Sequence, residues 1–506
     1  MKARRSLFTG RPPQTPHSAR QTRDRLPWSA LEQQVVRLQK QIAQASQRGD
    51  KPAVHRLQQQ VLESEAARLL AVRRVAEENQ GKHTAGVDGV KSLSASERLA
   101  MASAIHPRNW KQQLPLPVRR VWIAKPGTGE QRPLAILPMI DRCKQALVKL
   151  ALEPEWEVQF EPHSYGFRPG RGVHDAIAAI QVELDRQPCY VFHADIAEAF
   201  ASVDQAVLLE KLATSPALQH AITGWLTAGI MDGGVYVSSD TGIAQGGVLS
   251  PLLLNIALHG MEAVVTQGSA NGHAGEPGAR SIGPLLVRYA DDFVILHADL
   301  HELQQAVRRV RRWLAGLGFQ LHTDKTRLTH TLTPYQGQIG FDFLGFHIHQ
   351  QAAENQATGR EQALVPHSRP ILLPFMPLPV QRSQQGRIRT IITPSDDASE
   401  RHLAALDHRL QQFQTAPQAR VIAELNPLVI GWASYYNGIV PAATLSRYDD
   451  LLQQRLLAWA SRRHPGQARD WLLARYWQRV GEQRRVFATS AGVQLRAYRQ
   501  PSILRG

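Results

Sequence analysis

Residues 285–296 read Leu285-Leu286-Val287-Arg288-Tyr289-Ala290-Asp291-Asp292-Phe293-Val294-Ile295-Leu296, and this stretch decides the fold class. Its flanks are rich in Val, Leu, Ile and Phe, which predicts two β-strands with the acidic pair at the tip between them. Adjacent carboxylates repel each other unless a cation neutralises them, and Mg²⁺ suits carboxylate oxygens. An ordinary hairpin turn, where Asp is common, explains the pair equally well. The rest of the chain has to decide between the two.

Length and charge narrow the class of protein. The chain has 506 residues, enough for about three domains with ample cores. No run of about eighteen apolar residues occurs, so no membrane span is expected. There are 59 Lys and Arg against 43 Asp and Glu, which gives a net charge of +16. This excess favours a polyanionic partner, nucleic acid above all, over charge kept only for solubility.

Cysteine usage and the N-terminal composition bear on location. Cys143 and Cys189 are the only cysteines and lie far apart, so neither a zinc module nor a disulfide framework is expected. A reducing compartment fits, and we expect the bacterial cytoplasm, in association with the nucleoid. The Arg- and Ser-rich start is similar in composition to an organellar transit peptide, but Pro12, Pro13 and Pro16 disfavour an amphipathic helix there.

Hydrophobic periodicity divides the chain into segments. A helical pattern begins at Leu31, is broken by Gly49-Asp50 and resumes from about Pro52 to Asn79, which predicts a helical hairpin. Further strands are predicted at Cys189–Ala194 and Phe343–Ile348. The expected segments are a disordered basic arm (1–25), an N-terminal helical extension (26–90), a mixed region (91–190), a region of strands and helices around the acidic residues (191–350), a Gln-, Pro- and Arg-rich linker or insertion (351–397), a helical region (398–480) and a short basic tail (481–506).

A third carboxylate, Asp195, ends the predicted strand that begins near Tyr190, and Phe200 follows five residues later. Taken alone, Asp195 is better explained as an ordinary strand-end residue. Metal-dependent nucleotidyl transfer, however, needs two or three carboxylates from separate strands around two Mg²⁺ ions. One ion activates the attacking 3′-hydroxyl, and the other holds the triphosphate and stabilises the leaving pyrophosphate. Asp195, Asp291 and Asp292 together meet this requirement.

A glycine-containing loop at 241–251 leads into a predicted helix at 252–262. Gly246 and Gly247 let the backbone approach a ligand closely, and the neighbouring Gln245 could contact a base or sugar. The same residues also suit an ordinary turn, with Ser250 capping the helix and Pro251 in its first turn. Both interpretations hold together.

With these pieces assembled, the chain resembles the reverse transcriptases encoded by group II introns, the intron maturases. Tyr289 to Asp292 matches that family's metal-binding motif, Asp195 to Phe200 its first palm motif, and Gln245 to Leu252 its nucleotide-loop motif. The remaining matches, in the family's order, are Asn79-Gln80-Gly81-Lys82 with Gly86-Val87-Asp88-Gly89 in the N-terminal extension, Arg132-Pro133-Leu134, Asp141-Arg142 and Ser164 to Arg171 in the fingers, and Asp324-Lys325-Thr326 with Phe343-Leu344-Gly345-Phe346 in the palm.

The resemblance implies an α+β, right-hand polymerase with fingers (91–190), an antiparallel-sheet palm (191–350) and a helical thumb and maturase region (398–480). It implies that the three aspartates are catalytic and bind two Mg²⁺ ions, or Mn²⁺, together with the backbone carbonyl of Ile196. Nucleotide contacts are implied for five residues, of which Phe200 would exclude a ribose 2′-hydroxyl and Lys325 is explained equally well as a surface lysine. The five are Lys125, Arg132, Phe200, Gln245 and Lys325.

Interleaved basic and aromatic residues follow in the helical region. Leu428, Trp432 and Tyr436 recur at helical spacing and are expected to be mostly buried. Basic residues near aromatic ones suit contact with the RNA backbone and stacking on bases. The resemblance implies RNA contacts at Arg168, Arg171, Arg462 and Arg463.

Three features depart from the family. Ala201 stands where many members have Asp, and Ala244 where many have Pro; neither position ligates metal, so activity is expected to survive. Many members end in an HNH endonuclease with paired cysteines, and none is expected after residue 480. Second-strand DNA cleavage is therefore not expected of this chain.

The implied function is a multifunctional intron-encoded protein. It would bind its intron RNA, assist splicing, and copy an RNA template into DNA by adding dNTPs to a DNA primer. A related bacterial reverse transcriptase adapted to host use, in phage defence or CRISPR-associated spacer acquisition, would share the same polymerase core. A pure RNA-binding splicing factor with an inactive polymerase is the other alternative, and the three carboxylates argue against it. The oligomeric state stays open.

Overall fold

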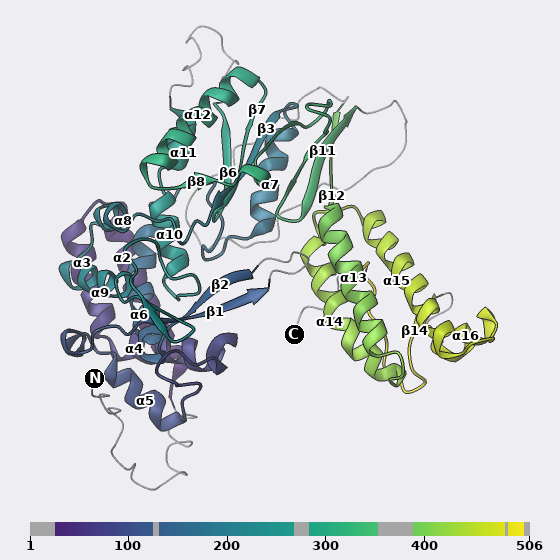
Figure 1. The fold of residues 1–506 in the computed structure, drawn as a ribbon, viewed down its shortest axis with the longest axis horizontal. Coiled ribbons are helices and arrows are strands. Elements are labelled where there is room, and N and C mark those ends of the chain that lie inside the picture. Colours follow the sequence, from purple (N-terminus) through teal and green to yellow (C-terminus); the bar gives the residue numbers. More distant parts are fainter. Residues whose placement is uncertain (1–25, 125–130, 268–282, 353–387, 481–483, 500–506) are drawn as a thin grey trace.

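The computed structural model describes residues 26–124, 131–267, 283–352, 388–480 and 484–499. A helical N-terminal body, a central sheet flanked by helices and a C-terminal helical module follow one another along the chain and in space (Figure 1). The mixture of helices and sheets agrees with the predicted α+β class. The basic arm (1–25), Lys125 and most of the predicted linker fall outside the described residues.

The N-terminal body surrounds α6, whose residues are nearly all buried. The predicted helical hairpin is confirmed, because α2 and α3 are separated at Gly49-Asp50 and pack against each other. Asp50 caps α3 by accepting from the backbone N–H of Ala53 at 3.0 Å. The predicted single helix from 52 to 79 is wrong, because Ser64 ends α3 and caps a separate helix. The helices and helical turns of this body are α2 (Trp28–Gln47), α3 (Lys51–Glu63), α4 (Glu65–Arg73), η1 (Arg74–Glu78), η2 (Gln80–His83), α5 (Ala95–Ala104), η3 (Pro107–Gln112) and α6 (Met139–Glu157).

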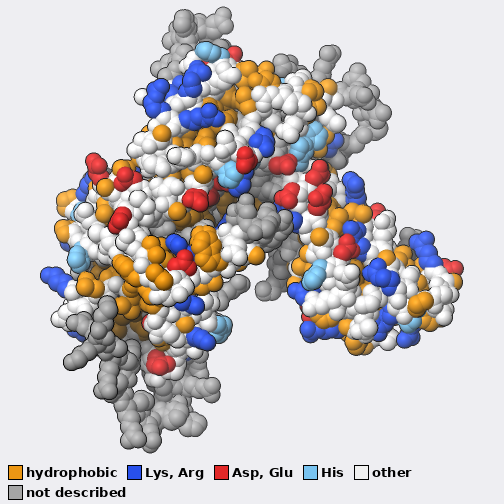
Figure 2. Space-filling view, viewed as in Figure 1, with side chains coloured by type: hydrophobic (Ala, Val, Ile, Leu, Met, Phe, Trp, Pro, Cys, Tyr) orange, Lys and Arg blue, Asp and Glu red, His pale blue; other side chains and the backbone are white. Residues whose placement is uncertain are grey.

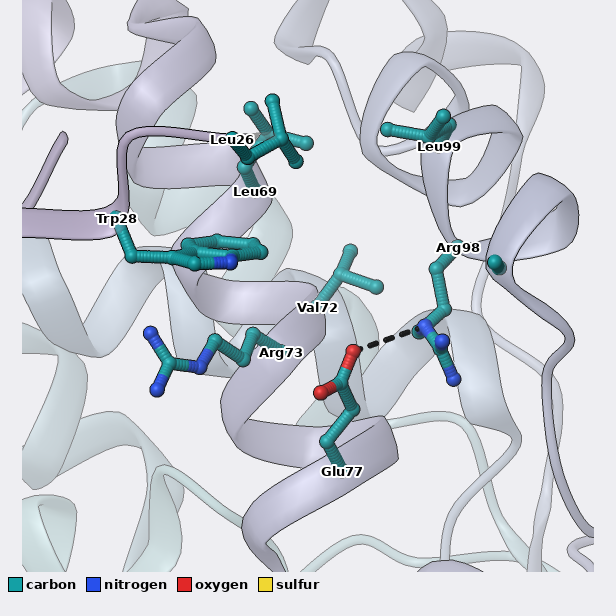
Figure 3. Close-up of a pocket in the computed structure, with 9 residues that line it drawn as sticks. Leu26, Trp28, Leu69, Val72, Arg73, Glu77, Arg98 and Leu99 are labelled. Carbon is teal, nitrogen blue, oxygen red and sulfur yellow. Dashed lines mark ion pairs between the residues drawn. The ribbon is translucent and has the colours of Figure 1, made fainter. Parts of the chain in front are cut away.

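A small apolar pocket joins three of these helices. Figure 3 shows Trp28 from α2 lying over the Arg73 side chain from α4, with a guanidinium-to-ring distance of 4.7 Å. On the other side of the pocket, Arg98 of α5 pairs with Glu77 at 2.9 Å. These contacts hold α2, α4 and α5 together as one unit.

A small sheet next to the N-terminal body has the strand order β2-β1-β4-β5. Trp122, Ile123 and Tyr236 are exposed large apolar side chains on it. Its strand β2 also reaches toward the centre of the molecule, since the N–H of Ala135 donates to the carbonyl of Gln245 at 2.7 Å. The strands are β1 (Val118–Ala124), β2 (Gln131–Ile136), β4 (Ile230–Asp232) and β5 (Val235–Val237).

The central sheet is antiparallel and has the order β6-β7-β3-β8, with β9 also paired to β3. Side chains alternate between its faces. Phe192 and Phe293 join one core with α12, whereas Val191 and Val294 join the other core with α7. The elements are β3 (Tyr190–Ala197), β6 (Leu285–Tyr289), β7 (Asp292–His297), β8 (Gln320–Leu321), β9 (Arg327–His330), α7 (Val173–Leu184), α8 (Gln205–Leu212), α9 (Pro216–Leu226), α10 (Ser250–Leu258), α11 (Met261–Thr266), α12 (Leu300–Gly316) and η4 (Thr323–Lys325).

Most predicted central strands are confirmed, but two expectations here are wrong. The predicted helix at 252–262 is broken at Gly260, whose φ of +101° separates α10 from α11. The predicted strand Phe343–Ile348 is two strands, because Leu344 and Gly345 both take positive φ and form a two-residue hairpin turn.

Residues 388–394 correct the predicted linker, since they form a strand that pairs with β11 along its whole length. The composition predicted a linker because the strand that pairs with residues 388–394 is far away in sequence, at residues 346–352. The three-stranded sheet consists of β10 (Phe341–Phe343), β11 (Phe346–Ala352) and β12 (Ile388–Pro394).

Two tyrosines of the C-terminal module are hydrogen-bonded to this sheet. The hydroxyls of Tyr435 and Tyr436 donate to the carbonyls of Leu344 and Gly345, at 2.8 and 2.9 Å. The module contains α13 (Asp396–Gln412), α14 (Gln418–Tyr436), α15 (Ala442–Arg463), α16 (Arg469–Tyr476), β13 (Trp477–Val480) and β14 (Arg484–Phe487).

The buried face of α14 differs from the predicted one. Leu425, Val429 and Ala433 are its buried stripe, together with Tyr436. Leu428 and Trp432 lie only half-buried at its edge. Trp432 stacks there on His402 with 4.2 Å between ring centroids. The prediction followed the aromatic residues, so its stripe lies beside the smaller residues that are in fact buried.

The predicted basic tail is, where described, part of the fold. Tyr498 is 1% exposed, its hydroxyl lies 2.6 Å from His402 Nε2, and its N–H donates to Asp449 at 2.8 Å. Irregular backbone carries no periodicity, so the sequence pattern missed this packing. Among the described helices, none has both the length and the apolar character that a membrane crossing requires.

Replacing Tyr498 by Ala is expected to destabilise the C-terminal module by about 3–5 kcal/mol, because it opens a cavity and leaves His402 without its partner. Hydrogen exchange of the α13 and α15 amides measures the effect. Val493→Ala, at a position 42% exposed, is the matched control. Equal exchange in both variants would show that the tail adds nothing to the module.

Candidate active site

The acidic pair lies between the two predicted strands: Ala290 and Asp291 form a two-residue turn after β6, and Asp292 is the first residue of β7. Tyr289 pairs with Asp292 across the turn. Ala290 takes a φ of 60°, which is uncommon for a residue with a side chain. The left-handed residue lets the chain reverse within two positions, so both carboxylates emerge at the same end of the sheet.

Asp195 lies directly opposite Asp292 in the register of β3 and β7. Facing residues in an antiparallel pair have Cα atoms about 4.5–5.5 Å apart. The N–H of Ile196 donates to the carbonyl of Asp291 at 3.0 Å, so the turn is also tied to β3. The three predicted carboxylates therefore gather at one end of the central sheet.

Burial and mutual repulsion perturb this group. Burial, and secondly the charge of Asp195, raise the pKa of Asp291 above its ordinary value. Two polar side chains lie against the other carboxylates: Lys325 of η4 is hydrogen-bonded to Asp195, and His193 Nε2 lies 2.8 Å from Asp292 Oδ1. The arrangement is a concentrated negative site that attracts positive charge.

His193 was not singled out from the sequence, although a signal existed. It stands two residues before Asp195 on the same strand, and alternate residues share a face. A polar residue at that spacing within an apolar strand points to the site. A lone histidine carries little information by itself, which is why the signal was missed.

The predicted nucleotide loop is hydrogen-bonded to the segment that follows β3 and to β2. The N–H of Ile243 donates to the carbonyl of Phe200 at 2.7 Å, and the Gln245 carbonyl accepts from β2. Phe200 and Gln245 are half-buried, and Arg132 is exposed on β2. Ser250 does not cap α10 as predicted; its hydroxyl instead donates to the carbonyl of Ala244 at 2.7 Å and closes the loop.

Three family models match the chain in sequence order. The N-terminal domain of reverse transcriptase matches residues 24–105, reverse transcriptase (RNA-dependent DNA polymerase) matches 123–348, and the group II intron maturase-specific domain matches 400–477. Protein YkfC of Escherichia coli is 32% identical over 314 residues, which cover 55% of this chain and 80% of that protein. The chain belongs to the group II intron reverse transcriptase and maturase family.

Other relatives of this group II intron reverse transcriptase support the same conclusion. The group II intron-encoded protein LtrA of Lactococcus lactis is 36% identical over 156 residues, covering 30% of this chain but only 26% of that protein. Maturase-like protein 1 of Euglena gracilis is 26% identical over 325 residues, covering 63% of this chain and 64% of that protein. The chain is accordingly an RNA-directed DNA polymerase with a maturase region.

The carboxylates of this reverse transcriptase suit a divalent metal ion. Oxygen ligands of this kind are the ones that Mg²⁺ prefers. Within the described ranges, no three His, Cys, Asp or Glu side chains already stand together as a metal site. Asp195 and Asp292 are instead engaged with Lys325 and His193.

The arginines predicted to contact RNA are mostly engaged within the protein. Arg168 is buried, its guanidinium holding Glu157 and the carbonyls of Glu161 and Ser164. Arg171 donates to the carbonyl of Pro162. For Arg168 this geometry favours a structural role over RNA contact.

At the end of α15 the two neighbouring arginines differ. Arg463 donates to the carbonyls of Gln414 and Ala416 and lies over Trp459. Arg462 is exposed, and its one hydrogen bond to a described residue is a long contact of 3.4 Å with the Gln414 side chain. Arg462 is therefore the better placed of the two to reach an external phosphate.

Asp291→Asn is expected to raise the Tm of the metal-free protein at pH 7. The pKa of Asp291 is higher in the folded protein than in the unfolded chain. Below the ordinary pKa the carboxyl is neutral in both states and costs no stability, whereas the folded protein becomes less stable as pH rises from the ordinary pKa to the raised one. The gain over wild type should vanish below about pH 4. Differential scanning fluorimetry in EDTA measures it.

Asp299→Asn is the matched control, with the opposite sign. Asp299 caps α12 through the N–H of Glu302, which lowers its pKa, so that substitution should reduce Tm at pH 7. A lower Tm for Asp291→Asn at pH 7 would contradict the raised pKa.

Proposed function

We propose that this protein adds dNTPs to the 3′ end of a DNA primer on an RNA template, and that it binds its intron RNA to assist splicing and mobility. The observation that carries the proposal is the convergence of Asp195, Asp291 and Asp292 at one end of an antiparallel sheet. Nucleotidyl transfer depends on such a group because attacking and leaving oxygens both develop charge that needs stabilising.

Asp195, Asp291 and Asp292, with the carbonyl of Ile196, are the residues that would hold two Mg²⁺ ions. Bound there, the ions supply activation of the 3′-hydroxyl and stabilisation of the pyrophosphate leaving group. Lys325 is 55% exposed at its side chain, so it can leave Asp195 and follow the negative charge of an incoming triphosphate. His193 keeps Asp292 oriented from the β3 side.

The nucleotide is selected by the loop beside the carboxylates. Phe200 would lie against C2′ of the sugar and exclude a ribose hydroxyl. Gln245 is tied through its own backbone to β2, which also carries Arg132. Arg132 and Lys125 would contact the triphosphate, where a guanidinium suits bidentate phosphate binding.

The anatomy proposed is a right hand, with the β1–β2 sheet as part of the fingers, the central sheet as the palm and α13 to α15 as the thumb. Figure 2 supports this with a broad hollow between the C-terminal helices on the right and the N-terminal body on the left. A template–primer duplex requires a space of this kind beside the catalytic residues. The positive charge of the whole chain would favour its entry.

RNA binding in the maturase role is proposed for the outer face of the C-terminal module. Arg462 is exposed there, and Trp471 is 40% exposed with Arg475 6.0 Å from its ring. An exposed ring with a guanidinium group beside it suits base stacking and phosphate contact. The match to the maturase-specific domain favours intron RNA over a host-adapted role. Intron RNA domains flanking the gene would distinguish the two, and the bacterial cytoplasmic location stays a prediction.

Asp291→Ala is expected to lower dNTP incorporation on an RNA template with Mg²⁺ by about a thousandfold or more, since metal-held charge stabilisation is worth several kcal/mol and each 1.36 kcal/mol is tenfold. Primer extension measures the rate. Intron RNA affinity, measured on the same preparation, should stay unchanged and serves as the folding control. Unimpaired synthesis would sink the metal assignment.

Phe200→Ala is expected to reduce discrimination against NTPs by about tenfold or more, because a steric block to one hydroxyl is removed. The measurement is the ratio of kcat/KM for a dNTP and the corresponding NTP. Phe319→Ala, at a buried ring 2% exposed in the same core, controls for general loosening. An equal loss of discrimination in both variants would remove the assigned role of Phe200.

A further inference from the structure

Arg288 is fully buried, at 0% exposure, two residues before Ala290, where the catalytic turn begins. Its Nη1 donates to the carbonyl of Ala290 at 3.0 Å and to Asn255 Oδ1 at 3.1 Å. Its Nη2 donates to Ser164 Oγ at 2.8 Å. A guanidinium in the interior thus grips the backbone of the one turn residue with a left-handed conformation.

Two further contacts enclose the same turn. Asn255 Nδ2 donates to the carbonyl of Gly166 at 2.8 Å. A Cβ on Gly166 would lie 2.8 Å from the carbonyl carbon of Tyr289, and closer still to the Ala290 nitrogen, so only glycine allows this approach. Since Asn255 belongs to α10, which follows the nucleotide loop, these contacts join the turn to two distant parts of the chain, residues 164–166 and α10.

The positive charge of Arg288 lies close to the acidic turn. Burial lowers its pKa to about 10, which still leaves it protonated at neutral pH. The carboxylates of Glu161, Glu262 and Asp291 favour that charge. A buried guanidinium is costly unless it is well bonded and compensated, so its presence beneath an acidic turn calls for a role.

We propose that Arg288, held by Asn255, is the positioning residue of the catalytic turn: it fixes the Ala290 carbonyl and the left-handed backbone so that Asp291 and Asp292 are presented together to metal. This inference rests on the proposed function. The guanidinium itself touches neither nucleotide nor metal. Its grip is shared with α10, so the metal turn and the nucleotide loop keep a constant relative position.

Arg168 provides the contrast. It is also buried, and it also contacts Ser164, donating to that residue's carbonyl at 2.7 Å. Its other partners are Glu157 and the Glu161 carbonyl, and no hydrogen bond from it to the turn is found among the described residues. Loss of either arginine should therefore harm folding stability, whereas only loss of Arg288 should harm metal binding.

The test compares Arg288→Met, Arg288→Lys and Asn255→Leu with Arg168→Met in the full-length protein. Mn²⁺ binding is measured by electron paramagnetic resonance, the Mg²⁺ dependence of primer extension by rate, and stability by Tm. Arg288→Met should weaken Mn²⁺ binding about tenfold or more and raise the Mg²⁺ requirement in step. Asn255→Leu should act in the same direction, and Arg288→Lys should recover part of the affinity.

Arg168→Met should change Mn²⁺ affinity by no more than about twofold, even if its Tm falls as much as the Tm of Arg288→Met. If Arg288→Met does not fold, Asn255→Leu and Arg288→Lys decide the question. Unchanged Mn²⁺ affinity in the folded Arg288 and Asn255 variants, beside an active and metal-binding wild type, overturns the positioning role alone. A wild type that neither binds Mn²⁺ nor extends a primer overturns the proposed function, and this inference with it.

Discussion

Repulsion among three carboxylates at one end of a sheet is the constraint around which this molecule is arranged. Asp195 faces Asp292 across β3 and β7, and Asp291 is half-buried beside them with a raised pKa. A fold that gathers such groups loses stability in doing so. The loss is tolerable because cations lie close on two sides: Lys325 from η4 and the buried Arg288 beneath the turn.

The parts of the fold that the sequence predicted are those governed by local pattern. The apolar runs on either side of Asp291-Asp292 specify β6 and β7, because alternating faces of one sheet must both be buried. The break at Gly49-Asp50 between α2 and α3 is likewise a local signal. The failures come from pairings over long separations, as at residues 388–394, and from irregular segments such as that around Tyr498, where packing leaves no period in the sequence.

The same distinction applies to the site. The carboxylates were found because their chemistry is visible in the residue types and their order. His193, Arg288 and Asn255 were not, since a histidine, an arginine or an asparagine inside an apolar element has many structural explanations. Only the register of the strands and the burial of Arg288 show that these side chains converge on the turn.

The two cations beside the carboxylates differ in how firmly they are held, and this difference suits a polymerase. Arg288 is inaccessible and bonded to three other residues, so its support for the turn is permanent. Lys325 is 55% exposed on a short helical turn, so water and incoming phosphates compete for it. A site held only by buried contacts like that of Arg288 would exclude metal. A site held only by exposed contacts like that of Lys325 would lose its geometry between cycles. In the proposed mechanism, a buried support for the turn and an exchangeable cation at Asp195 would let the carboxylates accept and release divalent ions repeatedly while the turn that carries them stays in place.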